Sequence, residues 1–296
     1  MAFLDGRCLR VLRAATCLLM LLLPACSKRS GDGGPGPDPV PVPSGAIVYT
    51  AVGASDAVGI GSSAPCIPFT ACPDGRGYVP TLVRSLQAAG RTVTLHNLGI
   101  PASVLSPAIE ALGEQYGRDI PGNFLDQQLP FVGRDSTLVT VFAGGNDVNA
   151  IGTAIERGAA GNDVAGYVAQ QARIFGTEYA RLVSGIRSRA PAARVIVLNL
   201  PNLALLPYVA GRSPADQRIL QSIAVAFSRE ANARAAEGAV VIDLMCNARS
   251  YYAANYSSDG FHPNDAGYAY MAAEIERAVD ASPGAPDGDC SYMDRK

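Results

Sequence analysis

The sequence predicts an α/β fold: a three-layer α/β/α sandwich built on a five-stranded parallel sheet. Two observations predict it. Five short apolar runs alternate along the chain with longer segments of helical periodicity. Strands that alternate with helices form a parallel sheet covered on both faces, and right-handed crossovers leave only a few topologies. Among these we expect the flavodoxin-like strand order 2-1-3-4-5.

The expected strands are mainly apolar runs at residues 46–52, 92–95, 137–143, 194–200 and 239–244. The expected helices lie between or after them, at residues 78–89, 104–116, 164–189, 214–237 and 265–279. The long helices after the third and fourth strands are expected to cover the sheet.

The first 26 residues have the pattern of an export signal. Three arginines precede an apolar stretch at 14–23, which is well short of the roughly 20 residues that a membrane-spanning helix needs. The stretch leads into the letters L-P-A-C, which resemble a bacterial lipobox and imply a diacylglyceryl group on Cys26. An ordinary signal peptide cut nearby is the alternative. Ser27 resembles the residue that directs Gram-negative lipoproteins to the outer membrane.

Four segments are therefore expected along the chain. Residues 1–25 are the signal peptide, 26–44 carry the lipidated Cys26 and a Pro/Gly-rich tether, 45–281 form the folded domain, and 282–296 form a tail. The tether cannot bury a core, so it should be extended, spanning on the order of 50 Å at about 3.1 Å per residue. The folded domain would then stand off the periplasmic or cell-surface side of a membrane.

Composition excludes two classes of function. The 24 basic and 26 acidic residues give no basic stripe, so a nucleic-acid partner is not expected. Only two histidines are present, without a C-x-x-C pair or an H-E-x-x-H motif, so we expect neither a metal nor another cofactor. We expect the protein to be a monomer.

Four cysteines follow the proposed lipid-attachment site, in an exported chain where disulfides persist. They allow three pairings. We favour Cys66 with Cys72, which bracket one loop, and Cys246 with Cys290, which would staple the tail. A reactive thiol is the weaker alternative.

The most informative motif is D-G-F-H-P-N, which places Asp259 three residues before His262. A serine nucleophile needs such a base and a carboxylate to orient it. Ser55 follows the first predicted strand, at the edge where open α/β sheets place their sites. Gly99 and Asn146 follow the second and third predicted strands.

These four blocks, in this order, resemble the SGNH/GDSL hydrolase family, over a stretch from about residue 44 to 279. The resemblance implies that Ser55 is the nucleophile and that Asp259 and His262 complete its triad. It also implies that the Ser55 backbone N–H, Gly99 and Asn146 form the oxyanion hole. One departure is Ala54, because the family usually has an aspartate before the serine; here an aspartate follows it.

Other readings remain open for several residues. Asp147 and Asp243 are competing candidates for the orienting acid, Gly99 could simply end a strand in a turn, and His96 is expected to be structural. Three tyrosines before the catalytic loop could line an acyl or sugar subsite or pack as an aromatic surface, at positions 251, 252 and 256.

The sequence thus predicts an exported, lipid-anchored serine esterase that cleaves carboxylic esters through an acyl-enzyme without a cofactor. A lipase or lysophospholipase suits a membrane location. A deacetylase of cell-wall or other polysaccharide suits the family equally well. A different class also remains: a lipoprotein in which this fold has become a binding or structural module.

Overall fold

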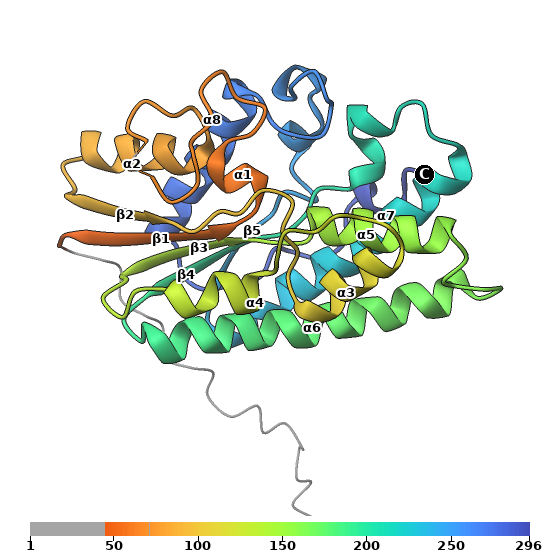
Figure 1. Ribbon diagram of the computed structural model, residues 1–296. Coiled ribbons are helices and arrows are strands. Elements are labelled where there is room, and N and C mark those ends of the chain that lie inside the picture. Colours follow the sequence, from red (N-terminus) through yellow and green to blue (C-terminus); the bar gives the residue numbers. More distant parts are fainter. Residues whose placement is uncertain (1–44, 71) are drawn as a thin grey trace, which may run out of the picture. The chain divides into compact units, whose positions relative to one another are not determined.

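The computed structural model describes residues 45–70 and 72–296 (Figure 1). The expected signal peptide, Cys26 and the tether lie outside these residues. Within the described part of the chain, no helix is both long enough and apolar enough to cross a membrane.

Five parallel strands form one sheet in the order β2-β1-β3-β4-β5. The strands are β1 (Ile47–Gly53), β2 (Val93–Asn97), β3 (Leu138–Phe142), β4 (Arg194–Leu198) and β5 (Val240–Ile242). Each begins within one residue of its predicted start. The fold class and the strand order predicted from the sequence are both confirmed.

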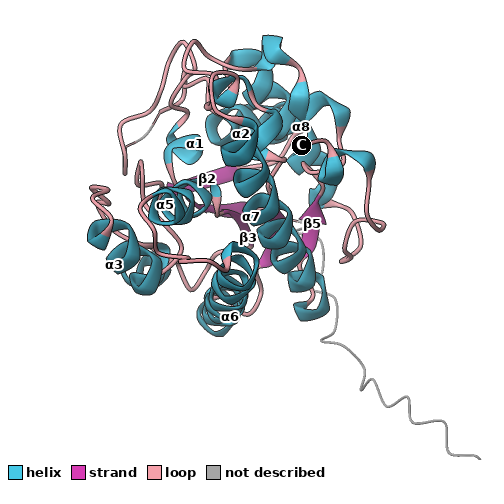
Figure 2. Cartoon of the chain, turned by 90° about the vertical axis from the view of Figure 1, so that its right-hand side faces the viewer, coloured by secondary structure: helices cyan, strands magenta, loops and turns pink. Residues whose placement is uncertain are grey.

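Helices cover both faces of the sheet (Figure 2). Helices α2 and α8 lie on one face, whereas α3, α5, α6 and α7 lie on the other. The helices are α1 (Ser55–Val58), α2 (Tyr78–Ala88), α3 (Pro107–Gln115), α4 (Phe124–Gln127), α5 (Gly145–Glu156), α6 (Val164–Arg189), α7 (Pro214–Ala233) and α8 (Asp265–Val279).

Alternate side chains of each central strand enter two separate cores, as the two-residue period of a strand requires. In β1, Tyr49 and Ala51 pack with α2 and α8. In β3, Val139 and Val141 pack toward α5, α6 and α7. Nearly continuous apolar runs are therefore needed in these strands, because both of their faces are covered.

Two helical segments differ from the prediction. Helix α3 begins at Pro107 rather than at residue 104, because Val104 pairs with Asn123 in a β-bridge. Residues 145–156, which are not among the helices expected from the sequence, form helix α5. Glycine and asparagine favour a helix poorly, but the burial of Val148 and Ile151 against the core stabilises it.

The two disulfides have the pairing that the sequence favours. Cys66 and Cys72 close a loop between α1 and α2. Cys246, just after β5, bonds to Cys290 in the tail. Both crosslinks therefore lie in segments without regular strands, where few backbone hydrogen bonds would hold the chain.

The tail packs beside the segment that leads to the catalytic motif. The rings of Tyr292 and Tyr251 stack with their centroids 4.3 Å apart. The Asn202 side chain donates to the Tyr292 carbonyl at 2.7 Å. Together with the Cys246–Cys290 bond, these contacts fix the tail on the folded domain.

Candidate active site

The residues singled out from the sequence gather at the carboxyl end of the sheet. Ser55 opens α1 immediately after β1, and Asn146 lies in the first turn of α5 after β3. Asp259 and His262 lie in the loop before α8. Sequence separations of up to 207 residues are closed because parallel strands end at one edge.

Ser55, His262 and Asp259 form a continuous chain of hydrogen bonds. The Ser55 Oγ lies 2.9 Å from the Nε2 of His262, and the Nδ1 of His262 lies 2.6 Å from the Oδ2 of Asp259. The carboxylate holds the proton on Nδ1, so Nε2 faces the serine as an acceptor. This geometry allows a proton to leave the hydroxyl as Ser55 attacks.

Asp259 is held as a carboxylate. Partial burial raises its pKa, but this effect is outweighed by the hydrogen bonds it accepts from the His262 ring, from two backbone N–H groups and from Ser257. The net effect lowers the pKa of Asp259 to about 2. The group therefore stays ionised at any pH at which the protein is expected to work.

The glycine and the asparagine of the D-G-F-H-P-N motif have structural roles in this loop. Gly260 has a φ of +69°, and a side chain there would meet the Tyr208 nitrogen at 2.6 Å. The Asn264 side chain accepts from the first N–H groups of α8 and donates to the Ala254 and Tyr256 carbonyls. These contacts fix the loop at both ends.

The competing acids do not contact His262. Asp243 accepts from Asn199 and from the Cys246 N–H. Asp147 accepts from the Leu105 N–H at 2.9 Å, and burial raises its pKa to about 7. Their roles in this geometry are to hold chain segments together.

Asn146 is oriented by its neighbour across the site. Its Nδ2 donates to the Ser103 carbonyl at 2.9 Å. A carbonyl only accepts, so this bond fixes which end of the amide is nitrogen, and the second N–H of that nitrogen remains for another acceptor.

The structure does not bring the Gly99 N–H into this group. That N–H donates to the Asn97 Oδ1 at 3.0 Å. A side chain at position 99 would meet the Ala57 Cβ at 2.8 Å. In this geometry the glycine lets the end of β2 pack beneath the helix that carries the nucleophile, and its oxyanion role stays a prediction.

Ala102, three residues further on, was not singled out from the sequence. It is exposed and has a φ of +64°, an uncommon conformation for a residue with a side chain. It directly precedes Ser103, the partner of Asn146. No pattern in a single sequence marks such a backbone angle at an alanine.

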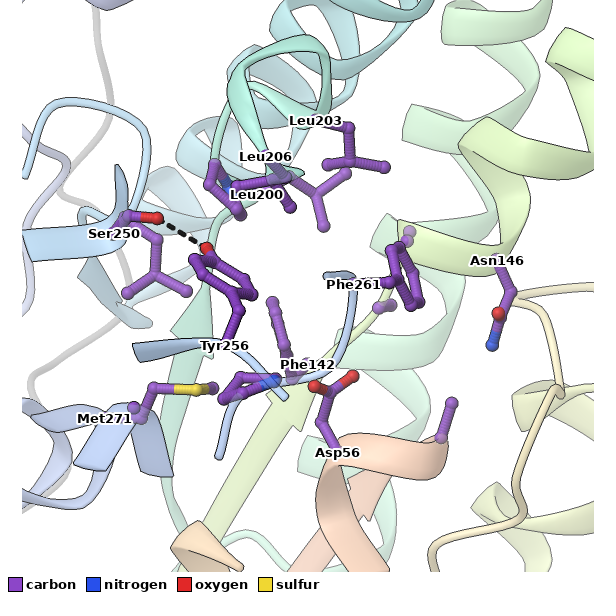
Figure 3. A pocket seen from close by; sticks show the side chains of 18 of the residues that line it. Asp56, Phe142, Asn146, Leu200, Leu203, Leu206, Ser250, Tyr256, Phe261 and Met271 are labelled. Atoms are coloured by element: carbon purple, nitrogen blue, oxygen red, sulfur yellow. Dashed lines mark hydrogen bonds between the residues drawn. The ribbon is translucent and has the colours of Figure 1, made fainter. Parts of the chain in front are cut away.

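The departure around the nucleophile has a structural counterpart. Ala54 is buried, whereas the Asp56 side chain points into a pocket beside the site (Figure 3). Burial raises the pKa of the Asp56 carboxyl, although the neighbouring His262 partly offsets this effect. The Tyr268 hydroxyl lies near this carboxyl and donates to the Ile60 carbonyl at 2.6 Å. An acid thus remains next to the serine, but on its other side in the sequence.

The pocket beside the site is open to solvent at its mouth. Its wall includes Ala54 and Asp56 beside the nucleophile, and Phe261 and Pro263 beside the base. The other walls are mostly apolar side chains from the ends of β3 and β4, the following loops and α8, including Phe142, Leu200, Leu203, Leu206 and Met271 (Figure 3). The pocket suits an apolar group attached near the reacting centre.

Of the three tyrosines and His96, one residue lines the pocket and the others lie outside it. Tyr256 lines the pocket, and its hydroxyl donates to the Ser250 carbonyl. Tyr251 stacks on the tail instead, and Tyr252 is exposed. His96 lies exposed on the edge strand β2, away from this group. Among residues 45–70 and 72–296, no cluster of three or more metal-ligating side chains occurs.

Comparisons with known proteins agree with this geometry. A model of the GDSL-like lipase/acylhydrolase family matches residues 51–270. The structure of the lipase Lip_vut3 from a goat rumen metagenome is 19% identical, with a TM-score of 0.54 over 80% of this chain and 98% of its own. Phospholipase A1 from Streptomyces albidoflavus NA297 is 18% identical, with a TM-score of 0.52 over 79% and 99%. At these identities the two structures show a shared fold. The comparison with curated proteins gives no match.

Proposed function

The chain belongs to the GDSL-like lipase/acylhydrolase family and is a hydrolase of this type, and on that premise we propose that it is a serine esterase acting through an acyl-enzyme. One observation carries the proposal: the unbroken chain of hydrogen bonds from Ser55 through His262 to Asp259. The resemblance to family blocks alone would leave open whether these side chains meet.

In the proposed reaction the Ser55 Oγ attacks the ester carbonyl while the Nε2 of His262 takes its proton. His262 then returns this proton to the departing alcohol, which leaves an acyl group on Ser55. A water molecule, deprotonated by the same nitrogen, releases the acid and restores the serine. Asp259 keeps the imidazole in the required tautomer and stabilises its charged form.

Negative charge on the carbonyl oxygen needs donors that are fixed before attack. We assign this role to the Ser55 backbone N–H, the second N–H of the Asn146 amide and a backbone N–H of the loop after β2. The Gly99 N–H would have to break its hydrogen bond to the Asn97 Oδ1 before it could act as this third donor. The Ala102 N–H has no partner among the described residues, so we place it there in preference to Gly99.

The apolar pocket supports an ester with an apolar acyl or alcohol group, which is the lipase or lysophospholipase class. A polysaccharide deacetylase would need room only for an acetyl group, and nothing in the pocket specifically favours it. The assembled Ser55–His262–Asp259 chain argues against a purely structural module. Export and a lipid anchor on Cys26 remain part of the proposal and would place the enzyme at a membrane surface.

The test is a series of p-nitrophenyl esters from acetate to octanoate with the purified chain. A buried methylene contributes about 0.8 kcal/mol, so kcat/KM should rise by up to about fourfold per added methylene until the pocket is full. Ser55→Ala should abolish turnover and labelling by a fluorophosphonate, whereas Ser62→Ala should keep both. Turnover of acetate alone would favour the deacetylase. A chain that neither turns over any ester nor takes the label would be a binding module.

A further inference from the structure

Gln128 is a buried amide that holds the strand carrying the nucleophile. It lies between α4 and the following 3₁₀ turn, and its side chain is fully buried. Its Oε1 accepts from the Gly53 N–H at 2.9 Å, and its Nε2 donates to the Gly53 carbonyl at 2.9 Å. One side chain thus satisfies both backbone groups of the residue two positions before Ser55.

This contact completes the pairing of β1 where its ladder with β2 opens. Strand β1 pairs with β2 as far as Ala51 and Asn97, and beyond that point the Ile100 N–H still reaches the Gly53 carbonyl, at 3.3 Å. The buried Gly53 N–H donates to the Gln128 Oε1 instead of to the β2 chain. The Gln128 amide has the same donor and acceptor as a peptide group, so it satisfies this N–H and shares the Gly53 carbonyl with Ile100.

The same amide reaches the opposite side of the site. Its Nε2 lies 3.4 Å from the Ser103 Oγ, and that hydroxyl donates to the Ile100 carbonyl at 2.6 Å. The Ser103 carbonyl is the acceptor that orients Asn146. Gln128 therefore joins the end of the nucleophile strand to the loop that orients the Asn146 amide.

We propose that Gln128 is a positioning residue for the esterase reaction, which holds the Ser55 turn and the loop 100–103 in the register that the oxyanion hole needs. This inference rests on the proposed function. Gln128 itself touches no reacting atom: it acts through Gly53 and Ser103. Donors that must sit within a few tenths of an ångström of a developing charge depend on such supports.

The first experiment uses Gln128→Met, which keeps the side-chain length and removes the hydrogen bonds to Gly53 and Ser103. Its kcat for p-nitrophenyl butyrate should fall by about 10- to 100-fold with KM changed less than about threefold, because the loss appears in the transition state. The matched control is Thr50→Val, which removes the buried 2.8 Å hydrogen bond to Ser136 from the same strand. It should lower Tm but keep kcat.

A double variant separates positioning from scaffolding. If Gln128 acts through the hole, Gln128→Met in an Asn146→Ala background should cost clearly less than it does alone. Equal losses in both backgrounds would overturn the proposal, as would a Gln128→Met enzyme that keeps wild-type kcat while melting lower.

Gln128→Glu keeps the test valid if the methionine variant does not fold. A neutral carboxylic acid has the donor and acceptor of the amide, but a carboxylate cannot donate to the Gly53 carbonyl. The ratio of mutant to wild-type kcat/KM should therefore rise as pH falls, and taking the ratio removes any pH dependence that the two proteins share. A ratio independent of pH would contradict the positioning role.

The two proposals can fail separately. If the wild-type chain hydrolyses none of the esters, the proposed function fails. The rate of fluorophosphonate labelling at Ser55 then still reports on Gln128, because phosphonylation also builds charge on an oxygen in the hole. Slower labelling of Gln128→Met, but not of Thr50→Val, would support the positioning role, and equal rates would refute it.

Discussion

Asn146 and Ser103, from two different loops at the carboxyl end of the sheet, are joined by one hydrogen bond of 2.9 Å from a side-chain amide to a backbone carbonyl. The bond fixes the orientation of the Asn146 amide. The second N–H of the amide nitrogen remains available for another acceptor. Asn146 also lies in the first turn of α5, so its removal affects a helix start rather than a free turn.

We expect Asn146→Ala to lower kcat by about 10² to 10³, with KM nearly unchanged, because an oxyanion donor acts only in the transition state. The matched control is Asn149→Ala, one turn later in α5, which loses its bonds to Tyr208 and Gly145 but touches no reacting group. Steady-state kinetics and Tm of both variants check this. An Asn146 variant with normal kcat when folded would make the residue scaffolding.

For Asp259→Asn we expect a fall in kcat of roughly 10²- to 10⁴-fold, because an amide stabilises the wrong imidazole tautomer and not the imidazolium. Asp243→Asn should retain most of the turnover, since Asp243 contacts Asn199 and Cys246 instead. His262→Ala should abolish turnover and His96→Ala should not. The reverse result for either pair would show that the wrong acid or base has been chosen.

The pH dependence of stability should reflect Asp147. Burial raises its pKa to about 7 from an unfolded value near 3.8, so between these values the folded state binds more protons than the unfolded state. The free energy of unfolding should therefore fall as pH rises through this window, by up to roughly 4 kcal/mol.

Asp147→Asn removes this titration, so its Tm should change less between pH 4.5 and 8 than that of the wild type. The variant should also gain relative to wild type at the upper pH. Thermal unfolding at several pH values measures both quantities. Parallel pH profiles for the two proteins would mean that Asp147 does not titrate in this range.

The proposed lipid anchor gives a prediction about mass and partitioning. The protein purified from bacterial membranes should begin at Cys26, carry a diacylglyceryl group there and partition into detergent. Mass spectrometry of the N-terminal peptide checks this, and Cys26→Ala should give an unprocessed, unlipidated chain. An N-terminus cut elsewhere, without lipid, would replace the anchor with an ordinary signal peptide.

The strands were predictable because β1, β3 and β4 are buried on both faces and must therefore be continuous apolar runs. Helix α5 was not, because its stability comes from tertiary burial of Val148 and Ile151 rather than from local propensity. The position of Asn146 in the first turn of this helix could not be predicted from the sequence for the same reason.

At the site, the three residues that the sequence singles out, Ser55, Asp259 and His262, lie together because each follows or precedes an element whose position the parallel sheet determines. Gln128 could not be found in this way. Its role depends on where β1 and β2 diverge, and a glutamine between two polar residues and a leucine resembles any solvent-facing position. The positive φ of Ala102 likewise cannot be recognised from the sequence.

The attachment of the tail has a consequence for the order of events during biosynthesis. Ser55 lies near the beginning of the folded domain, yet the segment leading to its base packs against residues that are translated after the base itself. A chain that stops before Cys290 would therefore lack both the disulfide and the Tyr292 stacking that support this segment. Because the crosslink needs an oxidising environment, full support of the base is coupled to oxidation of Cys246 and Cys290.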